Sequence, residues 1–251
     1  MWIALGRGTV DAPTLYRLPG LSPVIRSLYA AADLAPVAEL PWDKATPDVA
    51  FCVPGRVLDL RDYGFDPAFR GVAMIDFFLG RLGTDPLGVP AAARRNTWLA
   101  PRLDIAAWRP DGPVLLCAKS SMALRDMPDP VADAIFAFFT TRGIAVARPT
   151  EAKDIAGLAA QVRAARLVVS TDTAMVHLAD AMAVPCVAFF PTHDPAWRVR
   201  DYPLCTAIRL DPGLPAALEF SRGDADLAAT RAAWFRPGLD WLEPVLEATL
   251  G

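Results

Sequence analysis

The side chains best placed to do chemistry form a short polar run, Ser-Thr-Asp-Thr, at residues 170–173. An apolar run precedes it, and an amphipathic segment follows it from Ala174. A strand, a turn and a helix in this order put the turn at the carboxyl end of a parallel strand, where open α/β sheets bind ligands. Free N–H groups at the start of a helix suit a phosphate. The segment therefore predicts an anion site, with His177 one helical turn further on.

Two of these residues also have ordinary structural interpretations. Asp172 is a candidate helix N-cap, which is compatible with a place in a binding site. His177 shares a helix face with Thr173 and lies off the apolar stripe of the helix. A histidine there either contacts a ligand or holds a loop carbonyl. No second metal-binding side chain lies nearby, so we expect no metal at this position.

The elements that must position this turn are clearest in the second half of the chain. Apolar runs and helical periodicities alternate there as β-α-β-α-β-α-β, which predicts a doubly wound parallel sheet. Gly143 is expected to stop a helix that begins near Pro128. The expected strands lie at 113–118, 144–147, 167–169 and 186–190, and the expected helices at 128–142, 151–165 and 174–182.

The first half gives weaker signals. We expect strands at 2–5, 49–53 and 56–60, a helix at 67–82, and an interdomain connection rich in Pro, Ala and Arg at 84–110. The predicted organisation is an N-terminal α/β domain at 1–110 and a C-terminal Rossmann-like domain at 111–251. A terminal helix within 239–250 is expected to pack back on the first domain.

Composition excludes several classes of protein. The 251 residues are 53% hydrophobic and 21% charged, which is typical of a globular protein with a full core. A net charge of −3 without a basic stripe argues against nucleic-acid binding. Four widely spaced cysteines and two histidines make a zinc site improbable. With no leader-like start and no apolar run of about 20 residues, we expect a cytoplasmic protein, and peripheral attachment to a membrane stays open.

Residues 172–181 read Asp-Thr-Ala-Met-Val-His-Leu-Ala-Asp-Ala, and Phe190-Pro191-Thr192 ends the next apolar run. This arrangement resembles the donor-binding signature of the heptosyltransferase-like glycosyltransferases, which include the ADP-heptose:lipopolysaccharide enzymes. Their pattern is Asp-Thr/Ser-Gly-x-x-His-Leu-Ala-x-Ala between two buried strands. Ala174 stands where the family has glycine, so a Cβ lies where the backbone would approach a pyrophosphate.

The resemblance implies an α/β, GT-B-like fold of two Rossmann-like domains with a parallel sheet each, the first one shortened. It implies inverting transfer of a heptose-like sugar from a nucleotide-diphosphate donor to a saccharide or lipid-linked acceptor, without metal or cofactor. This activity would belong to cell-envelope lipopolysaccharide synthesis on the cytoplasmic face of the inner membrane. The residues implied to bind the donor are Asp172, Thr173, Ala174, His177, Arg125, Lys119, Ser120, Ser121, Trp197 and Arg198.

The general base of the family is an aspartate in a Gly-Asp pair after the first strand. Asp11 is the corresponding candidate, although Gly8 is not adjacent to it. A carboxylate there would take the proton of the acceptor hydroxyl. Asp59 and Asp62 are the next candidates, and His193 is interpreted as a loop residue. Two rival functions stay open: a degenerate protein that binds nucleotide sugars or acts as a scaffold, and a nucleotide-sugar epimerase.

Overall fold

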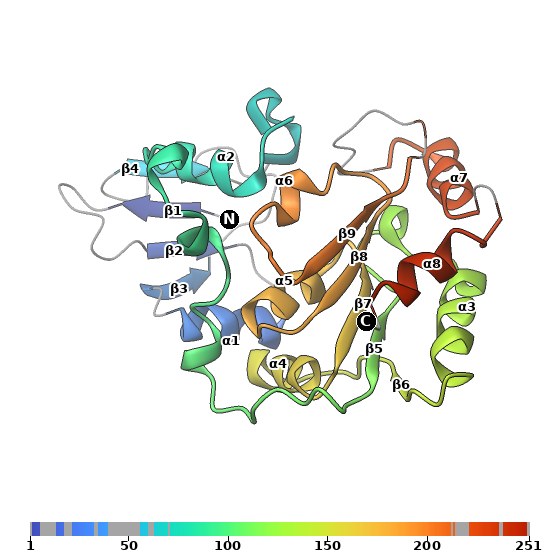
Figure 1. Ribbon diagram of the computed structural model, residues 1–251. Coiled ribbons are helices and arrows are strands. Elements are labelled where there is room, and N and C mark those ends of the chain that lie inside the picture. Colours follow the sequence, from blue (N-terminus) through green and yellow to red (C-terminus); the bar gives the residue numbers. More distant parts are fainter. Residues whose placement is uncertain are drawn as a thin grey trace.

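The computed structural model describes residues 2–5, 14–17, 22–32, 35–39, 56–59, 63–69, 71–211, 213, 221–235 and 238–249. The second half is built on a parallel sheet in the order β6-β5-β7-β8-β9 (Figure 1). Every residue of the three middle strands is buried, as expected for strands covered on both faces. The strands are β5 Val114–Cys117, β6 Val146–Ala147, β7 Leu167–Thr171, β8 Cys186–Phe190 and β9 Cys205–Arg209.

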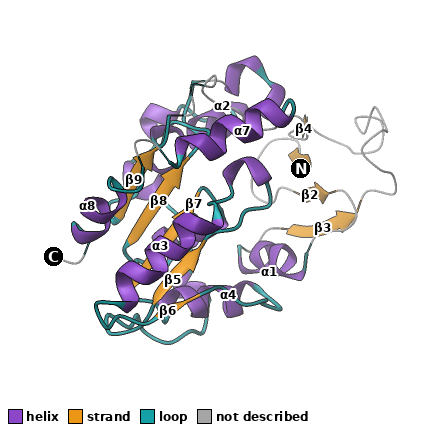
Figure 2. Ribbon diagram, turned by 90° about the vertical axis from the view of Figure 1, so that its right-hand side faces the viewer, coloured by secondary structure: helices purple, strands orange, loops and turns teal. Residues whose placement is uncertain are grey.

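Helices cover both faces of this sheet, and Figure 2 shows α3 lying along the strands. One apolar cluster joins a sheet face to α4 and α5, and a second joins the opposite face to α3, α8 and the end of α7. The expected α/β class, with a parallel sheet covered by helices on both faces, is thereby confirmed for the second half. The helices of this half are α3 Asp129–Thr140, α4 Ile155–Arg163, α5 Ala174–Ala181, α6 Ala196–Val199, α7 Asp224–Ala233 and α8 Leu242–Glu247.

Local chemistry explains where these helices begin and end. Asp154 caps α4, because its Oδ1 accepts a hydrogen bond of 2.7 Å from the N–H of Gly157. This cap places the start of α4 later than the expected residue 151. The chain leaves α3 through Gly143, whose φ of +71° is strained for any residue with a Cβ.

The strand order creates a crevice at one edge of the sheet. The chain runs from β5 outward through α3 to β6, then crosses back through α4 to β7 on the other side of β5. The connections that leave β5 and β7 at their carboxyl ends therefore diverge to opposite faces. Such a topological switch point is where open α/β sheets bind ligands.

The first half carries a four-stranded sheet in the order β3-β2-β1-β4, formed by β1 Trp2–Leu5, β2 Thr14–Arg17, β3 Ala35–Glu39 and β4 Arg56–Asp59. It is mixed, which corrects the expectation of a parallel sheet in this half. β1 pairs antiparallel with β2 and β4, and only β2 and β3 are parallel. The connection from Leu5 to Thr14 is too short for a parallel crossover, whereas α1, Pro23–Ala31, supplies one between β2 and β3.

Several polar contacts attach helices and turns of the first half to the second. Ser27 on α1 accepts a hydrogen bond of 2.7 Å from the N–H of Ile155. Asp76 on α2, Met74–Arg81, binds both terminal nitrogens of Arg200 at 2.8 and 3.0 Å. Within the expected connection 84–110, Arg94 binds both oxygens of Asp201 at 3.0 and 3.1 Å. A division of the chain near residue 110 stays a prediction.

Three expectations for the flanking segments need correction or lie outside the structure. The helix expected at 67–82 begins only at Met74, after a separate 3-10 turn at Pro67–Phe69. The terminal helix is α8, but Leu242 and Leu246 pack with α3 in the second half and not on the first. The strand expected at 49–53 lies outside the described residues. Across the described chain, no helix is long and apolar enough to cross a membrane.

Candidate functional site

The loops at the switch point enclose a pocket of about 430 Å³. The loop after β5 forms one wall, and the start of α5 after β7 forms another. Nine of the ten residues that the sequence singled out for donor binding line it, and Trp197 does not. The lining residues are Tyr63, Met74, Lys119, Ser120, Ser121, Arg125, Asp172, Thr173, Ala174, Met175, His177 and Arg198.

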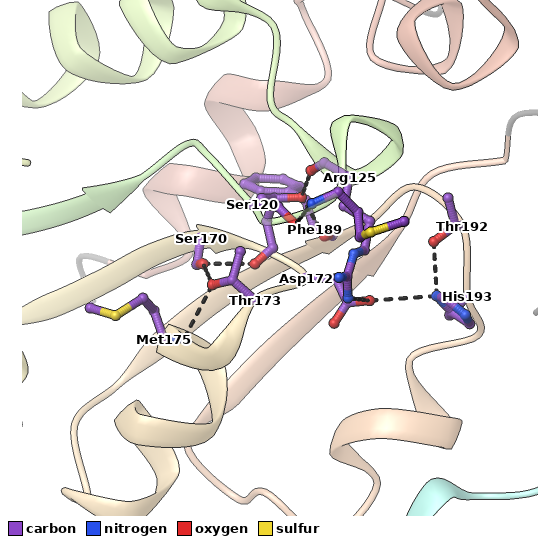
Figure 3. Close-up of polar contacts among 11 residues, drawn as sticks. Ser120, Arg125, Ser170, Asp172, Thr173, Met175, Phe189, Thr192 and His193 are labelled. Carbon is purple, nitrogen blue, oxygen red and sulfur yellow. Dashed lines mark hydrogen bonds and ion pairs between the residues drawn. The ribbon is translucent and has the colours of Figure 1, made fainter. Parts of the chain in front are cut away.

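Asp172 lies between Arg125 and His193 (Figure 3). Its Oδ2 is 3.5 Å from Nη1 of Arg125 and 3.5 Å from Nδ1 of His193. Burial alone would raise the pKa of Asp172, but the contact with His193 and the charge of Arg125 outweigh it and hold this pKa below its ordinary value. Asp172 is therefore a buried, ionised carboxylate.

His193 is a site residue that the sequence interpretation missed. Its side chain is fully buried, and Nδ1 lies 2.8 Å from Oγ1 of Thr192 as well as facing Asp172. In the sequence, His193 could have been identified as a site residue only from its place directly after Phe190-Pro191-Thr192, where the motif ends. Its contact with Asp172 arises because β7 and β8 are neighbours and their carboxyl-end loops meet.

A hydrogen bond to its carbonyl fixes the backbone of Arg125, whereas its guanidinium has a donor that remains unused in the described part of the chain. Arg125 ends the 3-10 turn Ala123–Arg125, and its carbonyl accepts a hydrogen bond from Oγ1 of Thr171. Nε of Arg125 is buried and has no hydrogen-bond partner among the described residues. Because an unpaired buried donor costs about 1–3 kcal/mol, this guanidinium is suited to an anionic ligand.

The start of α5 faces the same pocket. Thr173 is the N-cap: its Oγ1 accepts a hydrogen bond of 3.1 Å from the N–H of Met175 and contacts Oγ of Ser170 at 3.0 Å. The N-cap interpretation of Asp172 is therefore wrong, since its carboxylate faces Arg125 and His193 instead. Ala174, the first residue of the helix, is exposed and lines the pocket. The N–H of Val176 donates to the carbonyl of Thr173 at 3.2 Å, and the positive end of the helix dipole favours negative charge at this point.

His177 presents a neutral imidazole to the pocket. Its Nδ1 lies 2.7 Å from the hydroxyl of Tyr202, which accepts a hydrogen bond of 2.5 Å from Nδ2 of Asn96. The hydroxyl thus has its own proton to donate to Nδ1, which assigns the remaining imidazole proton to Nε2. Burial lowers the pKa of His177 and raises that of Tyr202, so both stay neutral near pH 7. His177 is then a hydrogen-bond donor through Nε2.

The loop after β5 is shaped by its own contacts. The N–H of Ser120 donates to Oδ1 of Asp126 at 2.8 Å, and Oγ of Ser120 accepts from the N–H of Met122 at 3.1 Å. Lys119 pairs with Asp129 at 3.0 Å, and both side chains are mostly exposed. Arg125 is therefore the more buried cation of the loop, and Lys119 a cation at its rim.

The remaining candidates lie elsewhere. Trp197 lines a neighbouring pocket of about 170 Å³ between α2 and α6, which Arg198 and His177 also line. The Arg198 guanidinium lies over the ring of Phe69, 5.3 Å from its centre. Asp11 and Asp62 lie outside the described residues, and Asp59 ends β4. No group of three His, Cys, Asp or Glu side chains suited to a metal occurs in the part of the chain that the structure describes.

A parallel α/β sheet with a pocket at its switch point has the architecture of a Rossmann-like unit. The family match is narrower: residues 128–204 match glycosyltransferase family 9 (heptosyltransferase). The segment runs from the start of α3 to the start of β9 and includes Asp172, Thr173 and His177. The resemblance to the heptosyltransferase-like family is confirmed over this segment.

Comparison with solved structures gives a match to Escherichia coli heptosyltransferase WaaC with ADP-2-deoxy-2-fluoro heptose. The two chains are 17% identical, with a TM-score of 0.37. The match covers 64% of this chain and 53% of that one, so it spans about half the length of the neighbour. No curated protein matches this chain.

Proposed function

We propose that this protein is a glycosyltransferase that takes a sugar from a nucleoside-diphosphate donor bound in the switch-point pocket and passes it to a saccharide acceptor. The observation that carries this proposal is the convergence of Arg125 and the start of α5 on one pocket. The start of α5 lies within the segment that matches family 9, and Arg125 lies just before that segment. Both features favour a ligand with concentrated negative charge.

The donor diphosphate would lie at the start of α5, at the positive end of its helix dipole. Arg125 would offset the charge that builds on the leaving diphosphate as the glycosidic bond breaks, which is the main electrostatic need of this reaction. Lys119 would add a second positive charge at the rim. These groups support a metal-independent mechanism. His177 would donate a hydrogen bond from Nε2 to a phosphate or sugar oxygen.

Inverting transfer also needs a base for the acceptor hydroxyl. Asp172 is the one carboxylate among the described residues that line the pocket, and its burial, pairing and lowered pKa make it a poor base. Its function would be to orient Arg125. We therefore keep Asp11 as the proposed base, followed by Asp59 and Asp62.

The finer assignments follow from the family. They are a heptose-like sugar, a saccharide or lipid-linked acceptor of the cell envelope, and a place on the cytoplasmic side of the membrane. A GT-B-like arrangement would put acceptor-side residues in 1–110 and donor-side residues in 111–251.

A second candidate function is donor binding without catalysis. Ala174 favours it, because its Cβ lines the pocket where the family has glycine. Donor turnover separates the two functions. An enzyme releases nucleoside diphosphate when donor and acceptor are both present, and a pure binder does not.

Calorimetric titration of ADP, UDP, GDP and CDP in the presence of EDTA tests the donor site. We expect one of these to bind, and Arg125→Ala to weaken it at least ten-fold. Arg142→Ala is the matched control, because Arg142 pairs with Glu243 and Glu247 on the opposite face of the sheet. Binding that requires Mg²⁺ would refute the metal-independent site, and equal binding by Arg125→Ala would refute the proposed role of this guanidinium.

A further inference from the structure

Two cysteines face each other across the edge of the parallel sheet. Cys186 begins β8 and Cys205 begins β9, and the two residues are direct partners in the register of these strands. Side chains that pair in this way point to the same face of a sheet, and both pack in the apolar cluster that includes α4 and α5. Both are free thiols. The fold therefore holds two thiols side by side.

The spacing of neighbouring strands suits a disulfide between them. Adjacent strands lie about 4.7–4.9 Å apart, and a disulfide joins residues whose Cα atoms are about 4.4–6.8 Å apart. Cys117 on β5 provides a contrast, because it belongs to the same apolar cluster but β7 lies between β5 and β8. Two strand spacings are roughly 9–10 Å, which exceeds what a disulfide can bridge. The sheet order therefore selects Cys186 and Cys205 as the pair.

The surroundings of the two thiols set the order in which they react. Cys205 is partly exposed, whereas Cys186 is buried. The adjacent thiol of Cys205 and burial hold the pKa of Cys186 well above its ordinary value, and burial raises the pKa of Cys117 to about 12. Access and thiolate character decide which thiol reacts. A reagent from solvent therefore meets Cys205 first, and Cys186 reacts with a group already attached to Cys205.

We propose that Cys205 and Cys186 are a thiol–disulfide exchange site, which a low-molecular-weight disulfide oxidises to a bridge between β9 and β8. The Cys205 thiolate attacks one sulfur of the reagent, forms a mixed disulfide and releases one thiolate. The sulfur of Cys186 then attacks the sulfur of Cys205 and releases the second thiolate. The two leaving groups take up the two protons that the pair loses. The protein is oxidised by two electrons, and the reagent is reduced to two thiols.

The bridge acts on the switch-point pocket through Tyr202. The N–H of Cys205 donates a hydrogen bond of 3.2 Å to the carbonyl of Tyr202. The hydroxyl of Tyr202 lies 2.7 Å from Nδ1 of His177, which lines the pocket. Bonded sulfur atoms are about 2.05 Å apart, much closer than two thiols in contact, so the bridge draws the start of β9 toward β8. Neither the bridge nor its effect on His177 depends on transferase activity.

Disulfide mapping of the folded, full-length protein tests this proposal. The protein is incubated with hydroxyethyl disulfide, its remaining thiols are alkylated in urea, and it is digested with trypsin. Each of the four cysteines lies in its own tryptic peptide, at 45–56, 103–119, 167–198 and 201–209. We expect peptides 167–198 and 201–209 to be joined, and dithiothreitol to separate them.

Single substitutions separate the two steps. Cys186→Ala should stop the reaction at the mixed disulfide on Cys205, and Cys205→Ser should prevent both steps. Cys117→Ala is the matched control, because it removes a thiol of the same apolar cluster and should leave the bridge intact. A mixed disulfide that persists on Cys205 of the wild type would overturn the proposal. So would a bridge to Cys117 or Cys52, or no reaction at Cys205.

The imidazole resonances of the protein give a second readout. The chain has two histidines, so comparison with His177→Gln assigns the resonances of His177. We expect them to shift on oxidation and to return with dithiothreitol, and Cys205→Ser treated in the same way should show no shift. Unchanged His177 resonances in the bridged protein would overturn the effect on the pocket.

Discussion

Replacing Asp172 by Asn tests the electrostatic core of the site. The substitution keeps the shape of the side chain and removes the charge that faces Arg125 and His193. Asp172 is 2% exposed, so solvent does little to screen the loss. Breaking a fully buried pair costs roughly 3–5 kcal/mol. The 3.5 Å separation and the 20% exposure of the Arg125 side chain reduce this to about 2 kcal/mol, within the range for hydrogen bonds to charged groups.

Thermal unfolding followed by circular dichroism measures this change, and a chain of this size should lose about 4–8 °C in Tm. Asp111→Asn is the control, because the Arg109–Asp111 pair is largely exposed and its loss should leave the unfolding midpoint unchanged. Unfolding of Asp172→Asn at the wild-type midpoint would refute the account of the site as an electrostatically stabilised unit.

The same substitution has a defined pH dependence. The folded protein holds the pKa of Asp172 below the unfolded value of about 3.9, so the stabilisation is fully present above that pH and is lost as pH falls through the folded pKa. The difference between wild type and Asp172→Asn should therefore be largest near neutral pH and shrink below about pH 4. A difference that stays constant to acid pH would show that packing, and not charge, is responsible.

Three further predictions concern single positions. Ala174→Gly should tighten ADP binding several-fold by removing a Cβ from the pocket edge, at a cost of no more than about 1 kcal/mol in helix stability; calorimetry that finds equal affinity would contradict the steric explanation. The pKa of His177 is lowered in the folded protein, whereas the unfolded chain takes up this proton near pH 6.5, so wild-type stability should fall as pH falls from about 7 to 5.5. His177→Gln should flatten this dependence, and denaturant midpoints measured across the range check it. Gly112→Ala would place a Cβ 1.9 Å from the carbonyl oxygen of Ala164 and should destabilise the fold by about 1–3 kcal/mol, whereas the control Gly80→Ala meets nothing and should be neutral or stabilising.

The second half of the fold was predictable because its signals are local. The apolar runs of β5, β7 and β8 are continuous, and α3 and α5 have a clear apolar periodicity, so their order fixed the α/β class. The mixed sheet of the first half was not predictable in the same way. β2 and β3 are short, and the pairing of β1 with both β2 and β4 depends on contacts between distant segments.

The candidate site was predictable at the level of its loops and less so at the level of its partners. Strand–turn–helix order placed Asp172 and Thr173 at the carboxyl edge of the sheet, and the family resemblance pointed to Arg125, which meets them there. The contacts of His193 with Asp172 and of Tyr202 with His177 depend on how later loops fold over that edge. Trp197 lines the neighbouring pocket because α6 turns it toward α2.

The contacts between residues 94–96 and the second half bear on how the chain can be dissected. The buried carboxylate of Asp180 accepts a hydrogen bond of 2.9 Å from Nε of Arg95 and one of 3.1 Å from the N–H of Asn96. Leu99 belongs to the same apolar cluster as α4 and α5. A fragment that starts at residue 111 would leave that carboxylate buried without its partners and expose one face of the core. A fragment that starts before α2 would retain both contacts. In this protein, the smallest piece that keeps the parallel sheet intact is therefore longer than the sheet and its own helices.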